Sequence, residues 1–306
     1  MSALQAHVAD YLRLRRALGF KLTRPGQELS QFVAYLETNG IQTITVEAAL
    51  AWTRLSTGVQ PVTLAHRLGT VRGFARYMHT IDQATEIPPP GLFGRQQRHT
   101  PYIYSAEEIA RLLAAAAQLR PQLRAITYQA LLGLLAATGM RVGEALHLTG
   151  RDVDLEAGVL KVRHAKFDRD RLVPLHPSVV SALADYALRR DRLAPTGRAD
   201  VLFVTTHGTP LSSKLVDATF PSLLTHAGLP TWPGHRPRVH DLRHSFVVNT
   251  LIGWHRDGVD VTARLPVLST YLGHVSPAST YWYLSAVPEL MQLAAAGLDL
   301  RFGSES

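Results

Sequence analysis

The chain has 306 residues and a formal net charge of +8, and it contains no cysteine. The lack of cysteine excludes disulfides, thiolate metal sites and a cysteine nucleophile, and it agrees with a reducing cytoplasmic location. With 46% hydrophobic and 18% charged residues, the composition is that of a folded protein. All but four of the 32 basic residues are arginine. A GC-rich genome would also enrich arginine, but the arginine fork binds phosphate well, so the charge favours a nucleic-acid partner.

Residues 1–86 have the pattern of a purely helical domain. Apolar spacing, together with capping residues and glycines, predicts helices over 4–18, 25–38, 45–55 and 61–79. The last of these helices has a basic outer side that carries Arg67, Arg72 and Arg76. We expect these arginines to contact DNA, with a merely solvated helix face as the alternative.

A linker is expected over residues 87–104, where three consecutive prolines, two glycines and basic residues occur together. Its Arg95 and Arg98 are further candidates for contact with a phosphate backbone. The N-terminus lacks the layout of a signal peptide, and the most apolar stretch, 125–137, is too short to span a bilayer. No membrane association is expected.

The third segment, 105–306, is expected to be a larger domain. Ser105 and Glu108 form a capping-box pattern at its start. Periodicity predicts two strands joined by a hairpin, over 159–163 and 171–175. It also predicts helices over 105–117, 124–137, 178–191, 212–227, 240–254, 279–285 and 288–297, besides a short one that opens at Arg141. The fold class is therefore mainly α with a small β-hairpin, α+β overall.

Phosphate-binding residue types gather in the segment HDLRHSF, residues 240–246. His240 and Arg243 are three residues apart, so on a helix they share one face and can bind one anion. A capping histidine and a surface ion pair are the plainer alternative. Arg141 lies at the start of a short helix and Lys166 in the turn of the hairpin; each is unspecific alone.

A zinc site is a rival interpretation of the same segment. His240 and His244 have the four-residue spacing of a zinc-binding pair, with Asp241 between them. Against it, Arg243 would place positive charge beside the metal, and no third ligand is evident. We expect no metal.

Taken together, these motifs resemble the tyrosine recombinase (phage integrase) family over about residues 105–290, and 1–86 is similar to that family's core-binding domain. The resemblance assigns catalytic roles to Arg141 in TGMRVGEAL, Lys166 in the hairpin, His240 and Arg243 in HDLRHSF, His274 in YLGHVSP, and Tyr283 nine residues later. The segment ASTYWYLSAVPELM, 278–291, looks more like transposon- or integron-type mobile-element members than chromosome-dimer resolvases.

The resemblance implies a site-specific DNA recombinase for integration, excision or transposition. Tyr283 would attack a phosphodiester and form a 3′-phosphotyrosyl intermediate. Arg141, Arg243, His240 and His274 would offset the developing charge. Lys166 would protonate the departing 5′-oxygen. The new bond conserves the energy of the old one, so no cofactor is implied.

A second tyrosine, Tyr281, also lies near the expected position of the nucleophile. Residues two apart on a helix point to different sides, so only one of the two can face a phosphate. The spacing from His274 favours Tyr283.

The implied partner is double-stranded DNA, held by both domains from opposite sides. Family precedent suggests a tetramer on two DNA sites, with 287–298 docking on a neighbouring protomer; packing on its own domain is the alternative. Other recombinases of the same element are further possible partners. Three other functions stay open: a type IB topoisomerase-like relaxing enzyme, an idle DNA-binding protein on the same fold, and a zinc hydrolase.

Overall fold

The computed structural model describes residues 2–93, 101–165, 169–230, 236–273 and 280–283. The chain divides into two compact units, residues 1–99 and 100–306. The border between these units falls inside the predicted linker, whose own limits stay a prediction.

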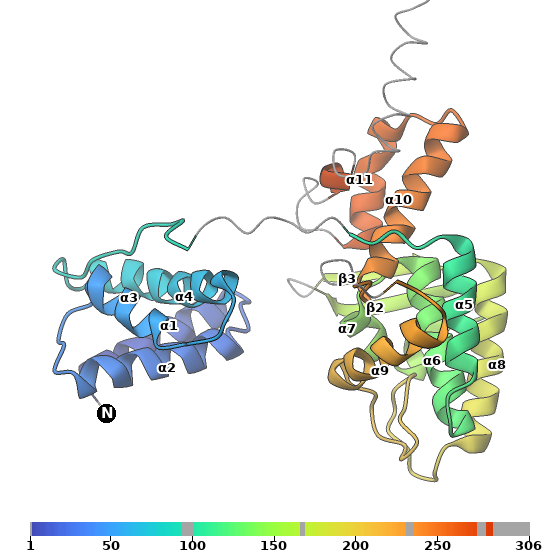
Figure 1. The fold of residues 1–306 in the computed structure, drawn as a ribbon, viewed down its shortest axis with the longest axis horizontal. Coiled ribbons are helices and arrows are strands. Elements are labelled where there is room, and N and C mark those ends of the chain that lie inside the picture. Colours follow the sequence, from blue (N-terminus) through green and yellow to red (C-terminus); the bar gives the residue numbers. More distant parts are fainter. Residues whose placement is uncertain (1, 94–100, 166–168, 231–235, 274–279, 284–306) are drawn as a thin grey trace, which may run out of the picture. The chain divides into compact units, whose positions relative to one another are not determined.

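The first unit is a bundle of helices around one apolar core (Figure 1). Its helices are α1 (Ala3–Ala17), α2 (Thr23–Thr38), α3 (Val46–Arg54) and α4 (Pro61–His79). Ser2 and Thr45 cap α1 and α3 by accepting from backbone N–H groups one turn later. Phe32, Trp52 and Phe74 are almost wholly buried between the helices. The four predicted helices are therefore confirmed, with small shifts at their ends.

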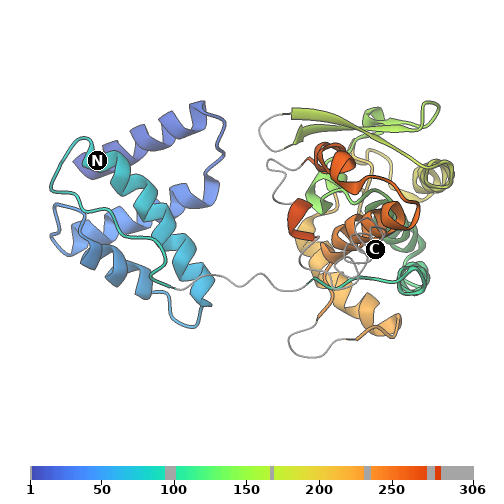
Figure 2. The ribbon, with the colours of Figure 1, turned by 90° about the horizontal axis from the view of Figure 1, so that it is seen from above.

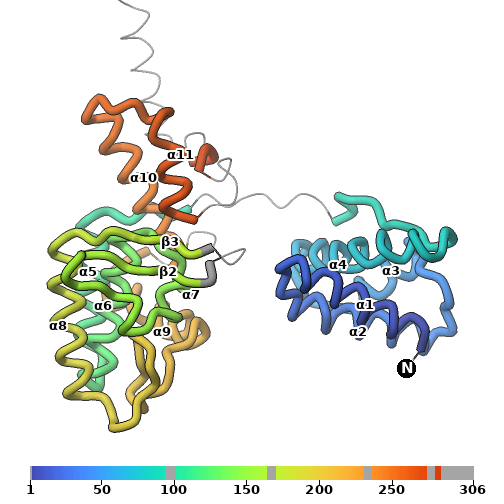
Figure 3. Tube along the Cα trace, turned by 180° about the vertical axis from the view of Figure 1, so that it is seen from behind, coloured from blue at the N-terminus to red at the C-terminus, as the bar shows by residue number. Residues whose placement is uncertain are grey.

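The second unit is mainly helical with one small sheet, which confirms the predicted fold class (Figures 1 and 2). Its elements in chain order are α5 (Ala106–Ala117), α6 (Gln122–Thr138), α7 (Val142–Leu146), the 3-10 turn Gly150–Asp152, β1 (Val153–Asp154), β2 (Val159–Ala165), β3 (Arg169–Pro174), α8 (Pro177–Leu193), α9 (Ser213–His226), α10 (Asp241–Arg256) and α11 (Val261–Leu272). Residues 280–283 form a further helical turn. Helix α6 lies between α5 and α8 (Figure 3).

The sheet is antiparallel in the order β1-β2-β3. Leu160 pairs with Val173 and Val162 pairs with Arg171, so these four side chains share one face of the sheet. Leu160, Val162 and Val173 are buried, which makes this the inner face. Arg171 is thereby turned inward, toward the protein interior.

Helices α10 and α11 form a second small core beside the main one (Figure 1). Val247 and Leu251 of α10 pack with Leu265 and Leu272 of α11, and Tyr283 belongs to the same cluster. The packing of these two helices places the end of α11 and residue 283 close to the first turns of α10.

Helix α11 and strand β1 were not predicted from the sequence. Pro266 lies inside α11, and a proline in a helix interior removes a backbone donor, which argues against a helix. Asp260 caps the helix nonetheless, accepting from the N–H of Ala263 at 3.1 Å. Of the predicted helix over 279–285, residues 280–283 are described and helical, and the predicted helix over 288–297 lies wholly outside the described residues. Among the residues that the structure describes, no helix combines the length and the apolar content needed to cross a bilayer.

Candidate active site

Arg243 joins three elements at the centre of the second unit. It lies in the first turn of α10 and is 3% exposed. Its guanidinium donates to the carbonyl of Gly139, after α6, at 2.7 Å and to that of Leu272, at the end of α11, at 2.9 Å. Burial and the nearby charge of Arg141 lower the pKa of Arg243 to about 10. At neutral pH this leaves a buried positive charge, which favours an incoming anion.

Arg141 begins α7, as predicted, with Glu144 as its partner one turn later. The Glu144 carboxylate accepts from the backbone N–H of Arg141 at 3.0 Å and from its guanidinium at 2.8 Å. The same guanidinium donates to the carbonyl of Gly273 at 3.0 Å. Its side chain is 32% exposed, against 11% for Arg171. Arg141 is therefore the more accessible of these two arginines.

Arg171 is a third arginine of the cluster, and it was not among the predicted site residues. It donates to both carboxylate oxygens of Glu144, at 3.1 and 2.7 Å, and to the carbonyl of Tyr271 at 2.9 Å. Burial alone would raise the pKa of Glu144, but the bonds and charge of Arg171 and the bonds from Arg141 hold that pKa at about 2. Glu144 is therefore ionised and fixes both arginines.

These three arginines hold the C-terminal end of α11 by hydrogen bonds. The carbonyls of Tyr271, Leu272 and Gly273 accept from Arg171, Arg243 and Arg141 respectively. Helix ends carry unsatisfied carbonyls and partial negative charge, so arginines are favourable there. Gly273 ends the helix with φ of +65°, and a Cβ at this position would lie 3.0 Å from an Arg171 nitrogen. The glycine of the LGH segment is thus required by the turn and by the close arginine.

Tyr283 lies against the start of α10 with its hydroxyl 2.6 Å from Nδ1 of His244. It is 3% exposed, whereas Tyr281 is 44% exposed. The two tyrosines therefore face different surroundings, as their spacing predicts. Tyr283 joins the apolar cluster of α10 and α11, and its ring lies 5.1 Å from that of Trp282.

His240 is the residue from which α10 starts. Its ring meets that of His244 edge-on, with centroids 4.9 Å apart. Burial, followed by the charge of Arg243, lowers the pKa of His240. A neutral imidazole still donates through one nitrogen, so His240 can bind a phosphate oxygen without carrying charge. The chain thus brings together Arg141, His240, Arg243 and Tyr283 from three separate places in the sequence.

Two predicted residues, Lys166 and His274, lie outside the described residues, and their roles stay predictions. In the first unit, Arg67 stacks on Trp52 at 4.0 Å and bonds to Ser56. Arg72 donates to the carbonyls of Pro88 and Pro89, at 2.6 and 2.8 Å. Both guanidiniums therefore also have structural contacts.

Arg76 is exposed, whereas Arg67 and Arg72 are only partly so. Arg95 and Arg98 lie outside the described part of the chain. Contact between any of these five arginines and DNA remains a prediction.

The sequence suggested His244 only as half of a zinc-binding pair and did not single out Arg171. A signal for Arg171 exists in the strand pattern of β3: Arg171 alternates with buried Val173, while Leu172 is 65% exposed. A charged residue in the inward register needs a buried partner, and Glu144 provides it. His244 gave no comparable signal, because its contact with Tyr283 spans 39 residues.

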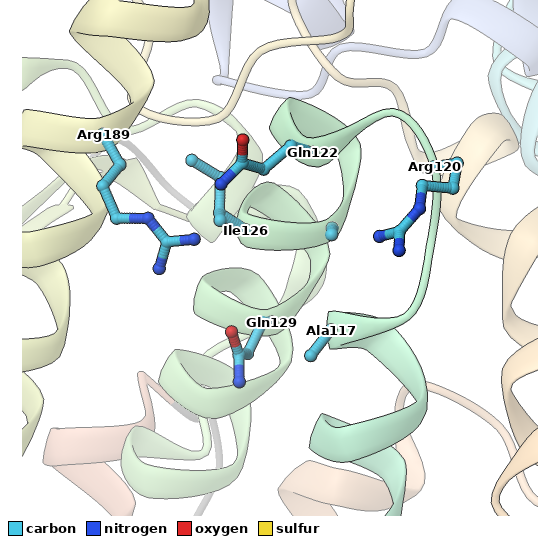
Figure 4. A pocket seen from close by; sticks show the side chains of 7 residues that line it. Ala117, Arg120, Gln122, Ile126, Gln129 and Arg189 are labelled. Carbon is cyan, nitrogen blue, oxygen red and sulfur yellow. The ribbon is translucent and has the colours of Figure 1, made fainter.

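No group of three or more histidine, aspartate or glutamate side chains suited to a metal occurs among the described residues. A hollow of about 400 Å³ beside α5, α6 and α8 is lined by Arg120, Gln122, Gln129 and Arg189, with apolar neighbours (Figure 4). It shares no residue with the arginine cluster. The chemistry of the arginine cluster, with its buried charge and adjacent tyrosine hydroxyl, makes the cluster the candidate site.

Comparison with known proteins agrees with this geometry. A sequence profile of the phage integrase family matches residues 103–289. A putative integrase/recombinase of Sinorhizobium fredii, y4rB, is 44% identical over 99% of both chains. A tyrosine recombinase XerC of Methylobacterium nodulans is 30% identical, covering 84% of this chain and 80% of the relative.

Among solved structures, the Tn1549 transposon integrase in complex with transposon right end DNA has the same fold. It superposes with a TM-score of 0.66 at 16% identity, over 99% of this chain and 100% of that one. The fold, the arginine cluster with its buried tyrosine and the family match agree. The chain belongs to the phage integrase family of tyrosine recombinases and is a site-specific recombinase that breaks and rejoins DNA.

Proposed function

We propose that the protein recombines DNA through a covalent 3′-phosphotyrosyl intermediate on Tyr283 and serves a transposon-type mobile element. The observation that carries the mechanism is the placement of the Tyr283 hydroxyl, buried beside the first turns of α10 and 2.6 Å from His244. Tyr281 points elsewhere and is largely exposed. Tyr283 is therefore the nucleophile.

The scissile phosphate binds at the arginine cluster. Arg141 and Arg243 donate to its nonbridging oxygens, and His240 donates a further hydrogen bond. Attack places additional charge on phosphorus, and donors fixed in advance stabilise that charge most effectively. Glu144 and Arg171 keep Arg141 in place, as the bonds at 2.7–3.1 Å between them indicate.

Cleavage and rejoining are two directions of one exchange. The Tyr283 oxygen forms a bond to phosphorus, the bond from phosphorus to the 5′-oxygen breaks, and Lys166 gives that oxygen a proton. A 5′-hydroxyl of a second strand then attacks the phosphotyrosine and releases Tyr283. The number of phosphoester bonds is unchanged, so the exchange needs no nucleotide cofactor.

Double-stranded DNA is the partner, bound in part by Arg67, Arg72, Arg76, Arg95 and Arg98. Support comes from the net charge of +8 and from the likeness to a transposon integrase whose solved structure holds transposon end DNA. We further propose a tetramer on two DNA sites, with 287–298 docking on a neighbouring protomer.

The test uses a pool of duplexes with random central segments and one nick, so that cleavage releases a short fragment and traps the adduct. Wild-type protein in EDTA is expected to form an adduct that survives denaturant and leaves a free 5′-hydroxyl, which a kinase can label. An adduct on the 5′ side would contradict the mechanism, as would failure to trap any duplex in the pool. Relaxation of supercoiled plasmid without sequence preference would favour the topoisomerase alternative.

A further inference from the structure

We propose that His244 is an additional catalytic residue, whose Nδ1 takes the proton of the Tyr283 hydroxyl while that oxygen attacks the phosphate. This assignment rests on the proposed function, because it takes Tyr283 as the nucleophile. It gives a role to a histidine that the sequence suggested only as half of a zinc-binding pair.

The contact between the two side chains is direct and short. The separation of 2.6 Å between His244 Nδ1 and the Tyr283 oxygen is within the range of a general base and its proton donor. The ring centroids are 5.4 Å apart, and Tyr283 is 3% exposed. Little bulk water therefore reaches the hydroxyl, so a protein group has to receive its proton.

Arg243 and His240, the other basic side chains of the first turn of α10, make contacts of their own. Arg243 precedes His244 on α10, but it donates to the carbonyls of Gly139 and Leu272 and carries a proton it does not give up. His240 meets the His244 ring edge-on, with centroids 4.9 Å apart, whereas Nδ1 of His244 lies 2.6 Å from the Tyr283 oxygen. His244 is thus the nitrogen base that contacts the Tyr283 hydroxyl.

Side chains of this protein donate and accept the protons that move during cleavage. The O–H bond of Tyr283 breaks, an N–H bond forms at Nδ1 of His244, and the tyrosine oxygen bonds to phosphorus. The bond to the 5′-oxygen breaks, and that oxygen is protonated by Lys166. During rejoining the neutral Lys166 takes the proton of the attacking 5′-hydroxyl, and the imidazolium of His244 returns its proton to Tyr283. The neutral imidazole must carry its own proton on Nε2 beforehand, so that Nδ1 can accept.

The first experiment needs no DNA. In the full-length protein with 15N-labelled histidine at neutral pH, we expect the His244 Nδ1 resonance to be that of an unprotonated, hydrogen-bond-accepting nitrogen. It should move in Tyr283→Phe and stay in place in Tyr281→Phe. A protonated Nδ1, or a resonance indifferent to Tyr283→Phe, would overturn the proposal even if no DNA site were found.

The second experiment uses a duplex trapped by the wild-type protein and measures binding and single-turnover cleavage separately. His244→Phe and His244→Asn should bind this duplex normally and cleave it about 10²- to 10⁴-fold more slowly. Asparagine can accept a hydrogen bond from Tyr283 but cannot take its proton, so wild-type cleavage by His244→Asn would reduce His244 to a positioning residue and refute the proposal.

A sulfur in place of the 5′-oxygen separates the two proton transfers, since a thiolate leaves without protonation. This substrate should restore cleavage by Lys166→Ala and leave His244→Phe slow; restoration of both would overturn the assignment. Thermal melting of each variant checks the fold. If the wild-type protein traps no duplex at all, the proposed function fails. The His244 Nδ1 resonance still tests whether His244 accepts a hydrogen bond from Tyr283.

Discussion

Arg171 on β3 donates to both carboxylate oxygens of Glu144 on α7, at 3.1 and 2.7 Å. The same carboxylate holds the backbone and side chain of Arg141, so one acidic residue orients two arginines. Arg171 also reaches the carbonyl of Tyr271 at the end of α11. The position of Arg141 therefore depends on a strand residue that does not itself have to touch DNA.

Arg171→Gln is expected to lower the free energy of unfolding of the second unit by about 1–3 kcal/mol, because the buried Glu144 carboxylate loses its charged bonds to Arg171 and keeps those to Arg141. Calorimetric unfolding provides the measurement. The matched control is Arg189→Gln, which removes an exposed pair with Asp185 at 3.2 Å and should cost less than about 1 kcal/mol. Equal effects of the two substitutions would show that the Arg171 pair is not structural.

The second unit should lose stability in acid, because its Glu144 carboxylate becomes protonated. Its folded-state pKa of about 2 lies below the ordinary value of 4.5, so its contribution is complete above about pH 5 and is lost as pH falls toward 2. The lost stability is on the order of 3 kcal/mol. Unfolding measured from pH 7 to pH 3 should show the larger part of this loss, and Glu144→Gln should be less stable at pH 7 and should flatten the dependence. A parallel pH dependence in Glu144→Gln would assign the acid sensitivity to other groups.

Gly139→Ala is expected to destabilise the protein by roughly 2 kcal/mol or more, since the residue has φ of +60° and an added Cβ would lie 2.9 Å from Cγ of Phe246. Because the Gly139 carbonyl accepts from Arg243, cleavage should fall as well. Gly143→Ala is the control: no atom lies within 4 Å of its added Cβ and its φ is ordinary, so a neutral or slightly stabilising effect is expected. Thermal melting compares the two, and similar melting points would refute the steric argument.

Arg76→Gln should weaken DNA binding and reduce the slope of log affinity against log salt by about one, if the exposed arginine of α4 neutralises one phosphate. The measurement is a salt titration of binding to a duplex that the wild-type protein traps. Arg13→Gln, which removes an exposed arginine of α1 paired with Asp10, serves as the control within the same unit. An unchanged slope for Arg76→Gln would remove α4 from the DNA-binding surface.

Most of the fold could be predicted because its signals are local. Apolar periodicity located the helices of the first unit, and the pair Ser105 and Glu108 marked the start of α5 as the capping box it forms. Helix α11 was not predicted: Pro266 weakens its local helical propensity, and the packing of Leu265 and Leu272 against α10 stabilises it. Tertiary contacts outweighed local propensity at that position.

The site could be predicted in part for the same reason. Arg141, His240, Arg243 and Tyr283 stand in short motifs with fixed spacing, and the fold gathers them. Arg171 depends on the inward register of β3, and the contact of His244 with Tyr283 depends on how residues 280–283 pack on α10. The strand pattern gives a local signal for Arg171, but the partners Glu144 and Tyr283 lie far from Arg171 and His244 in the chain, so no local pattern identifies these contacts.

The most direct test of the central claim is the identity of the residue that carries DNA. Wild-type protein, Tyr283→Phe and Tyr281→Phe are each incubated with a nicked duplex that the wild type traps, and the nucleotide-linked peptide is sequenced by mass spectrometry. We predict an adduct on Tyr283 in the wild type, the same adduct in Tyr281→Phe, and none in Tyr283→Phe. An adduct that persists in Tyr283→Phe and disappears in Tyr281→Phe would contradict the account.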